Sequence, residues 1–224
     1  MARIQLTLSA NAGGALQLGS HRLLIDALHN RKVSGFSTLD ENLEKCVLSH
    51  DNFVFPELIC VTHEHADHYS KALVQAALDR WPDAKCLIPQ QIHLSDEDVE
   101  LTFFPLTHDG EQFKNVPHFG ILIVWQGKNI LVPGDCPVAD DALLQAVSGK
   151  QIDLAILNFP WLTLKKGRAC LENRLKPKNC VFWHLPYAED DVNGYRRSAE
   201  LALNQYAGAA KLLCDPLQTI ELDI

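Results

Sequence analysis

A dense group of titratable side chains follows a short apolar run near residue 60. The stretch ELICVTHEHADHYS, residues 57–70, contains His63, His65, Asp67 and His68. His63 and His65 are two positions apart, so in extended backbone their imidazoles project to the same side and can bind one metal ion. Asp67 and His68 follow after the chain turns and can reach a neighbouring ion. Zinc accepts histidine and carboxylate ligands, so a metal explains this pattern better than a solvated histidine-rich loop does.

Three more candidate ligands follow apolar runs further along the chain. They are His108 in FFPLTHDG, Asp135 in ILVPGDC and His184 in CVFWHLP. Each run is a predicted strand, whose carboxyl end would deliver the side chain to an edge of a sheet. A catalytic zinc needs more ligands than two neighbouring histidines supply. One histidine at a strand end is ordinarily a surface or core residue, but three candidates in order favour a shared metal centre.

The elements that must position these residues are strands and helices in mixed order. Strands are predicted in RIQLTLSA, GALQLGSHRLLIDA (two strands with a turn at Gly19–Ser20), PELICVTH, AKCLIP, DVELTFFPLTHDG, FGILIVWQG, KNILVPGD, IDLAILNF, NCVFWHLP, AKLLC and QTIELDI. Helices are predicted in STLDENLEKCVLSH, SKALVQAALDRW, DDALLQAV, ACLENRL and DVNGYRRSAELALNQY. Thr38 followed by Glu41 predicts a capping box for the first helix. The pattern predicts one α/β domain over residues 1–224.

Length and charge limit the classes of partner. The chain has 224 residues, of which 47% are hydrophobic and 21% charged, the balance of a soluble globular domain. Its formal net charge of −8 gives no basic footprint for nucleic acid or an anionic membrane. No segment approaches the roughly 20 consecutive apolar residues of a membrane span. A small-molecule substrate is therefore expected, with nucleic acid and membrane partners disfavoured.

Cysteine usage and the start of the chain predict a cytoplasmic location. The sequence has seven cysteines, an odd number, and they form no C-x-x-C pair. This usage indicates reduced thiols rather than a disulfide framework. The opening MARIQLTLSANAGG carries one basic residue and no apolar run of signal-peptide length.

The combined pattern resembles the metallo-β-lactamase superfamily of metallohydrolases. The resemblance rests on H-x-H-x-D-H, a separate histidine, an aspartate in a GD step and a last histidine, and it extends from Gly13 to about His184. It implies a four-layer αβ/βα sandwich with metals along one edge of two packed sheets. LLIDA is similar to the family's early strand, so the resemblance also implies that Asp26 supports the metal-binding histidines without binding the metal itself.

The resemblance implies a site for two metal ions. The first ion would take His63, His65 and His108, the second Asp67, His68 and His184, and Asp135 would bridge both. Ions roughly 3.5–4 Å apart would share a water and lower its pKa from about 15.7 toward neutrality. The hydroxide formed in this way is the expected nucleophile, and Asp67 and Asp135 are the expected catalytic carboxylates. Zinc is the expected metal, with manganese and iron as alternatives.

The expected reaction is hydrolysis of a small ester, lactone or phosphate ester. Short stand-alone members, such as the ascorbate-6-phosphate lactonase-like group, are similar in overall layout. One alternative is a phosphodiesterase or nuclease of the same fold. Another is an iron-dependent thiol or persulfide oxidoreductase, although family members that use two irons tend to carry Glu at the position of His65. A relative that only binds or scaffolds is a further alternative, but such proteins usually lack ligands that this chain retains.

Five further residues have both a functional and a structural interpretation. Cys136 could touch the site, but a small buried packing residue is the favoured interpretation. His118 could contact substrate or lie at a polar rim. Phe159 and Trp161 could wall a pocket, whereas a plain amphipathic connection is favoured for their segment. Tyr187 could donate to a developing oxyanion or be an ordinary loop aromatic.

Overall fold

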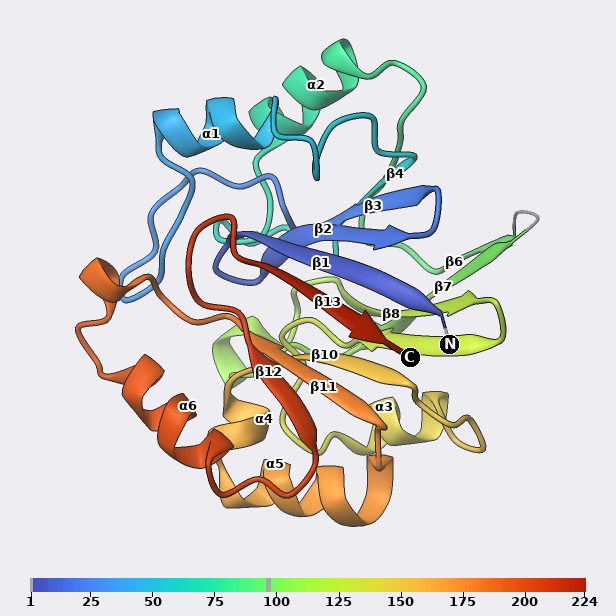
Figure 1. Cartoon of the computed structure of the whole chain (residues 1–224), viewed down its shortest axis with the longest axis vertical. Helices are drawn as coiled ribbons and strands as arrows, with labels where there is room; N and C mark the ends of the chain where they lie inside the picture. Colours follow the sequence, from blue (N-terminus) through green and yellow to red (C-terminus); the bar gives the residue numbers. More distant parts are fainter. Residues whose placement is uncertain (1, 96–97) are drawn as a thin grey trace. The chain divides into compact units, whose positions relative to one another are not determined.

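The computed structural model describes residues 2–95 and 98–224 and contains two β-sheets (Figure 1). The chain folds as two compact units, and each unit contains one sheet. The first unit comprises Met1–Ile88, His184–Arg196 and Leu213–Asp223, and the second comprises Pro89–Trp183, Arg197–Leu212 and Ile224. One domain over residues 1–224 stays a prediction. Within the described residues no helix is long and apolar enough to cross a membrane.

The first unit is built on a six-stranded sheet. Its strands, in spatial order, are β13 (Thr219–Asp223), β1 (Arg3–Ala10), β2 (Gly13–Leu18), β3 (His21–Ile25), β4 (Leu58–Cys60) and β5 (Lys85–Leu87). The pairs from β13 to β3 are antiparallel, as Figure 1 shows for red β13 beside blue β1, whereas β3, β4 and β5 are parallel. The helical segments are α1 (Glu41–Val47), α2 (Lys71–Arg80) and the short η3 (Ala188–Asp190).

The parallel part of this sheet positions the first candidate ligands. β3 and β4 pair in register up to Ile25 and Cys60, and the carboxyl ends of parallel strands meet at one edge. Asp26 directly follows β3, and the loop with His63 directly follows β4. The side chains of Asp26 and His63 therefore lie at the same edge, where both are buried.

The second unit is built on a seven-stranded sheet. Its strands, in spatial order, are β12 (Ala209–Leu212), β11 (Asn179–Trp183), β10 (Leu154–Asn158), β9 (Lys128–Val132), β8 (His118–Trp125), β7 (Val99–Leu106) and β6 (Ile92–Ser95). The helical segments are η1 (Glu111–Phe113), α3 (Asp141–Ala146), α4 (Pro160–Thr163), α5 (Lys165–Cys170), η2 (Leu171–Leu175) and most of α6 (Tyr195–Leu203). Leu131, Leu157 and Phe182 from the strands pack with Trp161 and Leu171 in its apolar core.

Most of the predicted elements are confirmed, and the mixed α/β class is confirmed with them. The β2–β3 turn has a left-handed Gly19, as the Gly19–Ser20 signal predicts, and Ser70 caps α2. The hairpin between β8 and β9 turns at Gln126 and Gly127, both with positive φ.

Two local predictions are wrong, and one strand was not predicted. Asp40, not Thr38, caps α1, because its carboxylate accepts from the N–H groups of Asn42 and Leu43. The segment from residue 158 to 168 is not a plain connection but contains α4 and the start of α5. β6 is a further strand that the sequence pattern did not indicate; it pairs with β7.

Candidate metal centre

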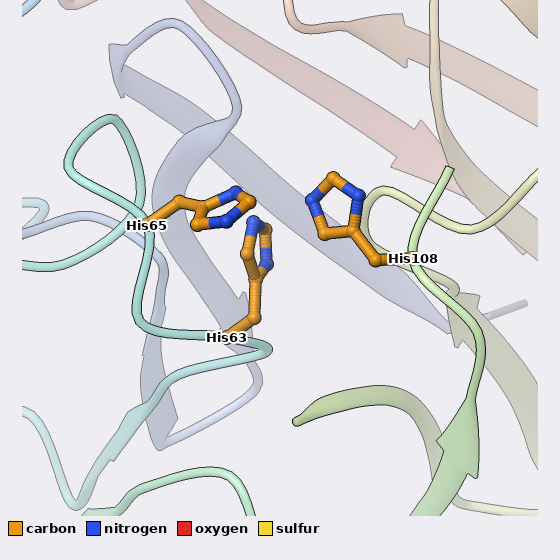
Figure 2. Close-up of side chains that lie close together, drawn as sticks. All are labelled: His63, His65 and His108. Atoms are coloured by element: carbon orange, nitrogen blue, oxygen red, sulfur yellow. The ribbon is translucent and has the colours of Figure 1, made fainter. Parts of the chain in front are cut away.

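The loop after β4 carries four of the predicted ligands in a crowded arrangement. His63 and His68 are buried and Asp67 is almost fully buried, whereas His65 is partly exposed. The ring centroids of His63 lie 4.7 Å from His65 and 4.1 Å from His68. Figure 2 shows the rings of His63 and His65, which meet edge to face. Imidazoles packed this closely can be accommodated as neutral rings.

Asp26 determines which nitrogen of His68 is available. Its Oδ1 accepts from the Thr62 backbone N–H at 2.8 Å, and its Oδ2 accepts from the Thr62 hydroxyl at 2.6 Å. The same Oδ2 lies 2.9 Å from Nδ1 of His68. A carboxylate only accepts, so Nδ1 of His68 carries the proton and Nε2 presents a lone pair. The predicted supporting role of Asp26 therefore matches its contacts.

The same hydrogen-bond chain extends to His63. The Thr62 hydroxyl gives its proton to Asp26, so its oxygen is left to accept from Nδ1 of His63, 3.0 Å away. His63 then also presents the lone pair of Nε2. One buried carboxylate thus sets the tautomer of two histidines, one directly and one through a threonine.

His184 and Asp67 complete a second group of potential ligands around His68. Nε2 of His68 lies 3.3 Å from Nε2 of His184, and Oδ2 of Asp67 lies 3.7 Å from the same His184 nitrogen. Two nitrogens on one tetrahedral zinc at about 2.0–2.1 Å would lie roughly 3.3–3.4 Å apart. An N–H hydrogen bond is usually shorter, near 2.9–3.0 Å. The separation therefore fits two ligands of one ion.

A backbone hydrogen bond and an aromatic contact hold His184 in a left-handed conformation. Its φ is +60°, a left-handed conformation that is uncommon outside glycine and that clusters at functional sites. Its backbone N–H donates to the carbonyl of Asn11 at 3.0 Å. The ring of Phe36 meets the imidazole edge to face at 4.6 Å between centroids.

The second unit brings together the other two predicted ligands, His108 and Asp135. Nδ1 of His108 donates to the Asp109 carbonyl at 2.6 Å, which leaves Nε2 as an acceptor 3.6 Å from Oδ2 of Asp135. The other carboxylate oxygen, Oδ1, accepts from Nδ2 of Asn158 at 2.6 Å. The Asp135 backbone N–H donates to Nε2 of His118 at 2.9 Å. Asp135 is therefore held at both its backbone and its side chain.

Potential metal ligands thus gather within each unit. In the first unit two groups have ligand atoms within 4.8 Å of one another: Asp26, His63 and His68, and Asp67, His68 and His184. Asp26 already accepts three hydrogen bonds, so the second group is better suited to an ion. Neutral imidazoles that present Nε2 lone pairs, together with a nearby carboxylate, are suitable ligands for a divalent cation such as zinc.

Comparison with known proteins identifies the fold. No model of a protein family matches the sequence, and no curated protein matches it. Among solved structures, the metallo-β-lactamase fold protein YhfI from Bacillus subtilis matches with a TM-score of 0.63 at 12% identity, over 99% of this chain and 100% of its own. The chain has the metallo-β-lactamase fold. The family resemblance is thereby supported at the level of the fold.

Two further solved structures show how varied proteins with the metallo-β-lactamase fold are. An isothiocyanate hydrolase from Delia radicum gut bacteria matches with a TM-score of 0.64 at 15% identity, over 96% of this chain and 98% of its own. CmlA, a diiron β-hydroxylase from Streptomyces venezuelae, matches with a TM-score of 0.57 at 14% identity, over 100% of this chain but only 55% of its own. The fold alone therefore fixes neither the metal nor the reaction.

Within this metallo-β-lactamase fold, the residues with two interpretations have mainly structural contacts. Cys136 and Trp161 are buried in the apolar core of the second unit, and burial raises the pKa of the Cys136 thiol. The Tyr187 hydroxyl donates to the Ser9 carbonyl at 2.7 Å, and burial raises the pKa of the Tyr187 hydroxyl. His118 binds the Asp135 backbone, and Phe159 is half-buried at the start of α4.

Two asparagines of the site were missed by the sequence reasoning. Asn11 donates from Nδ2 to Oδ2 of Asp67 at 3.3 Å, and Asn158 donates to Asp135. Asn11 directly follows β1, and Asn158 is the last residue of β10. A polar residue at the end of a strand is the same signal that identified His108 and Asp135, and it could have identified both asparagines.

Proposed function

We propose that this chain is a metal-dependent hydrolase whose site takes two ions. The ligands would be His63, His65 and His108 for one ion, Asp67, His68 and His184 for the other, and Asp135 between them. The observation that carries the proposal is the 3.3 Å separation of the Nε2 atoms of His68 and His184. With the proton of His68 held on Nδ1 by Asp26, its Nε2 lone pair faces a second imidazole, an arrangement that a shared cation stabilises.

The nature of the donor set supports zinc. Five of the seven proposed ligands are imidazoles, which suit zinc, and two are carboxylates. His63, His68 and His108 each have Nδ1 beside an acceptor oxygen, so each presents Nε2. Bound ions would supply a Lewis acid and would bring the pKa of a coordinated water from about 15.7 toward neutrality.

The chain's own residues contribute orientation and burial. Asp26 keeps His63 and His68 in the tautomer that can bind a metal, and Asn158 keeps Asp135 from rotating. The proposed substrate is a small ester, lactone or phosphate ester. The net charge of −8 supports a small molecule rather than a polynucleotide. The absence of disulfides among the seven cysteines supports a cytoplasmic enzyme.

Elemental analysis of the purified protein tests the metal site. We expect about two zinc ions per chain in the wild type and a clear loss in His68→Ala. The matched control is His93→Ala, which removes an exposed histidine of β6 that contacts Thr102. Circular dichroism would verify that both variants fold. Equal zinc in all three folded proteins would contradict the proposal.

A substrate panel tests the reaction. The panel contains a lactone, a carboxylic ester, a thioester, a phosphodiester and a β-lactam, with an isothiocyanate added because one structural neighbour hydrolyses that group. We expect hydrolysis of at least one small substrate by the zinc protein, strongly reduced in His68→Ala and retained in His93→Ala. Activity that survives in His68→Ala would place the reaction elsewhere.

An oxidative function at two irons is a second candidate, because the diiron hydroxylase CmlA shares the fold. It predicts that the purified protein carries iron and absorbs in the near-ultraviolet or visible range, and that it consumes oxygen. A colourless protein that contains zinc and hydrolyses a panel substrate would rule this candidate out. The imidazole-rich ligand set favours the hydrolase.

A further inference from the structure

Asn11 lies in the turn between β1 and β2 in an unusual conformation. Its φ is +51°, in the left-handed region that asparagine tolerates better than most residues, and its side chain is buried. Gly13, the first residue of β2, lets the strand approach Asp26 closely, because a Cβ atom on Gly13 would lie 2.1 Å from the Asp26 carbonyl oxygen. The turn thus runs beside the residue that orients His68.

Two different groups of Asn11 contact two of the proposed ligands. Its side-chain Nδ2 donates to Oδ2 of Asp67 at 3.3 Å, and its backbone carbonyl accepts from the His184 N–H at 3.0 Å. His184 is itself in a left-handed conformation, with φ of +60°. One buried turn therefore links a carboxylate and an imidazole that are far apart in the sequence.

The orientation of the Asn11 amide follows from its partner. The Asp67 carboxylate only accepts, so the amide nitrogen must face it and Oδ1 must point elsewhere. Oδ1 is buried and has no hydrogen-bond partner among the described residues. A buried acceptor without a partner is destabilising. Glycine would adopt the same φ without that penalty, so the backbone conformation alone does not explain an asparagine here.

We propose that Asn11 is a positioning residue for the ion held by Asp67, His68 and His184. Its two contacts fix the carboxylate of Asp67 relative to His184, whose Nε2 lies 3.7 Å from Oδ2 of Asp67. Partners of this kind orient metal ligands and set metal affinity. The inference rests on the proposed two-ion site, and it adds the residue that sets the affinity of one of the two positions.

Asn11→Gly tests this role, because glycine keeps the left-handed turn and removes only the amide. Zinc binding to the metal-free protein is measured by competition with a chelating dye. We expect one of the two ions to bind about 10–100-fold more weakly than in the wild type, with the other unchanged. The unfolding midpoint of the metal-free protein should stay close to that of the wild type. Asn11→Asp should also lose affinity, because an ionised aspartate cannot donate the hydrogen bond that Asn11 gives to Asp67.

Gln126→Gly is the matched control, since Gln126 also has a positive φ but lies in the exposed turn between β8 and β9. It should bind both ions as the wild type does. Wild-type affinity for both ions in Asn11→Gly would overturn this inference and leave the proposed function standing. A wild-type protein without tight zinc binding would overturn the proposed function itself. If Asn11→Gly does not fold, the same titration of Asn11→Asp decides, because aspartate also tolerates this conformation.

Discussion

Asp26 shows how one side chain controls the chemistry of its neighbours. Its carboxylate accepts from the backbone and the hydroxyl of Thr62 and from Nδ1 of His68. The Thr62 oxygen then accepts from His63. Two imidazoles are therefore left with Nε2 lone pairs, so the ligand geometry of the first unit depends on Asp26.

Asp26→Asn should weaken metal binding while the fold persists. Asparagine tolerates the φ of +47° at this position, but its NH₂ group can donate to Nδ1 of His68 and move the proton to Nε2. We expect zinc affinity to fall about 10–100-fold in a chelator competition. Asp40→Asn is the control, because both residue types cap a helix well. Unchanged affinity in Asp26→Asn would show that the tautomer is not set in this way.

Tyr187→Phe distinguishes the two interpretations of that tyrosine. The hydroxyl donates to the buried Ser9 carbonyl, so its loss should reduce the free energy of unfolding by about 1 kcal/mol. Turnover of a substrate should stay near the wild-type rate at saturating concentration. Urea unfolding and steady-state kinetics measure the two effects. A large fall in kcat without loss of stability would instead favour the oxyanion role.

At the scale of elements, local sequence signals predicted features that depend only on neighbouring residues, such as hairpin turns. Gly19 marks a hairpin turn because glycine adopts positive φ without a steric penalty. The capping box at Thr38 failed because Asp40, two positions later, offers a carboxylate to the same helix end. β6 escaped notice because it is a partly exposed edge strand without an apolar run, held by pairing with β7.

Asp153 links the starts of neighbouring strands in the second sheet. It precedes β10, accepts from the N–H of Asn129 in β9, and pairs with Lys178 just before β11. Burial acts to raise the pKa of the Asp153 carboxyl group. The hydrogen bonds from Lys178 and Asn129 outweigh the effect of burial, so the pKa is lowered. A group with a lowered pKa stabilises the fold when ionised and loses that contribution as pH falls through the folded-state pKa.

Asp153→Asn should therefore destabilise the protein in a pH-dependent way. The variant should have a lower free energy of unfolding than the wild type at pH 7 and by a similar amount at pH 5. This difference should shrink as pH falls below about 4. Urea unfolding across this range measures it. The control Asp83→Asn changes an exposed aspartate after α2 and should show little difference. A deficit in Asp153→Asn that is the same at pH 7 and pH 3 would contradict the linkage.

At the scale of the molecule, the proposed ligands come from both units of the chain. The first unit supplies His63, His65, Asp67, His68 and His184, and the second supplies His108 and Asp135. The resemblance predicted this set because the order of the motifs along the chain is distinctive. Asn11 and Asn158 lie outside the motifs of the resemblance, so only their positions at strand ends could have pointed to them. Their hydrogen bonds to Asp67 and Asp135 form in the folded chain.

Metal removal should lower the stability of the folded chain. A ligand that binds only the native state at about 1,000 times its dissociation constant stabilises it by about 4 kcal/mol. For a chain of this size that corresponds to roughly 8–16 °C in the unfolding midpoint. We expect a chelator to lower the midpoint by this order and added zinc to restore it, as followed by circular dichroism. Identical melting curves with and without chelator would argue against a tightly bound ion.

The central claim is that the paired Nε2 atoms of His68 and His184 are ligands of one ion. Anomalous diffraction from zinc-loaded crystals, measured on both sides of the zinc absorption edge, tests it most directly. We predict an anomalous peak about 2.0–2.1 Å from both nitrogens, with Asp67 at a similar distance and a second peak nearby. A zinc-loaded crystal with no peak between these two histidines would contradict the account.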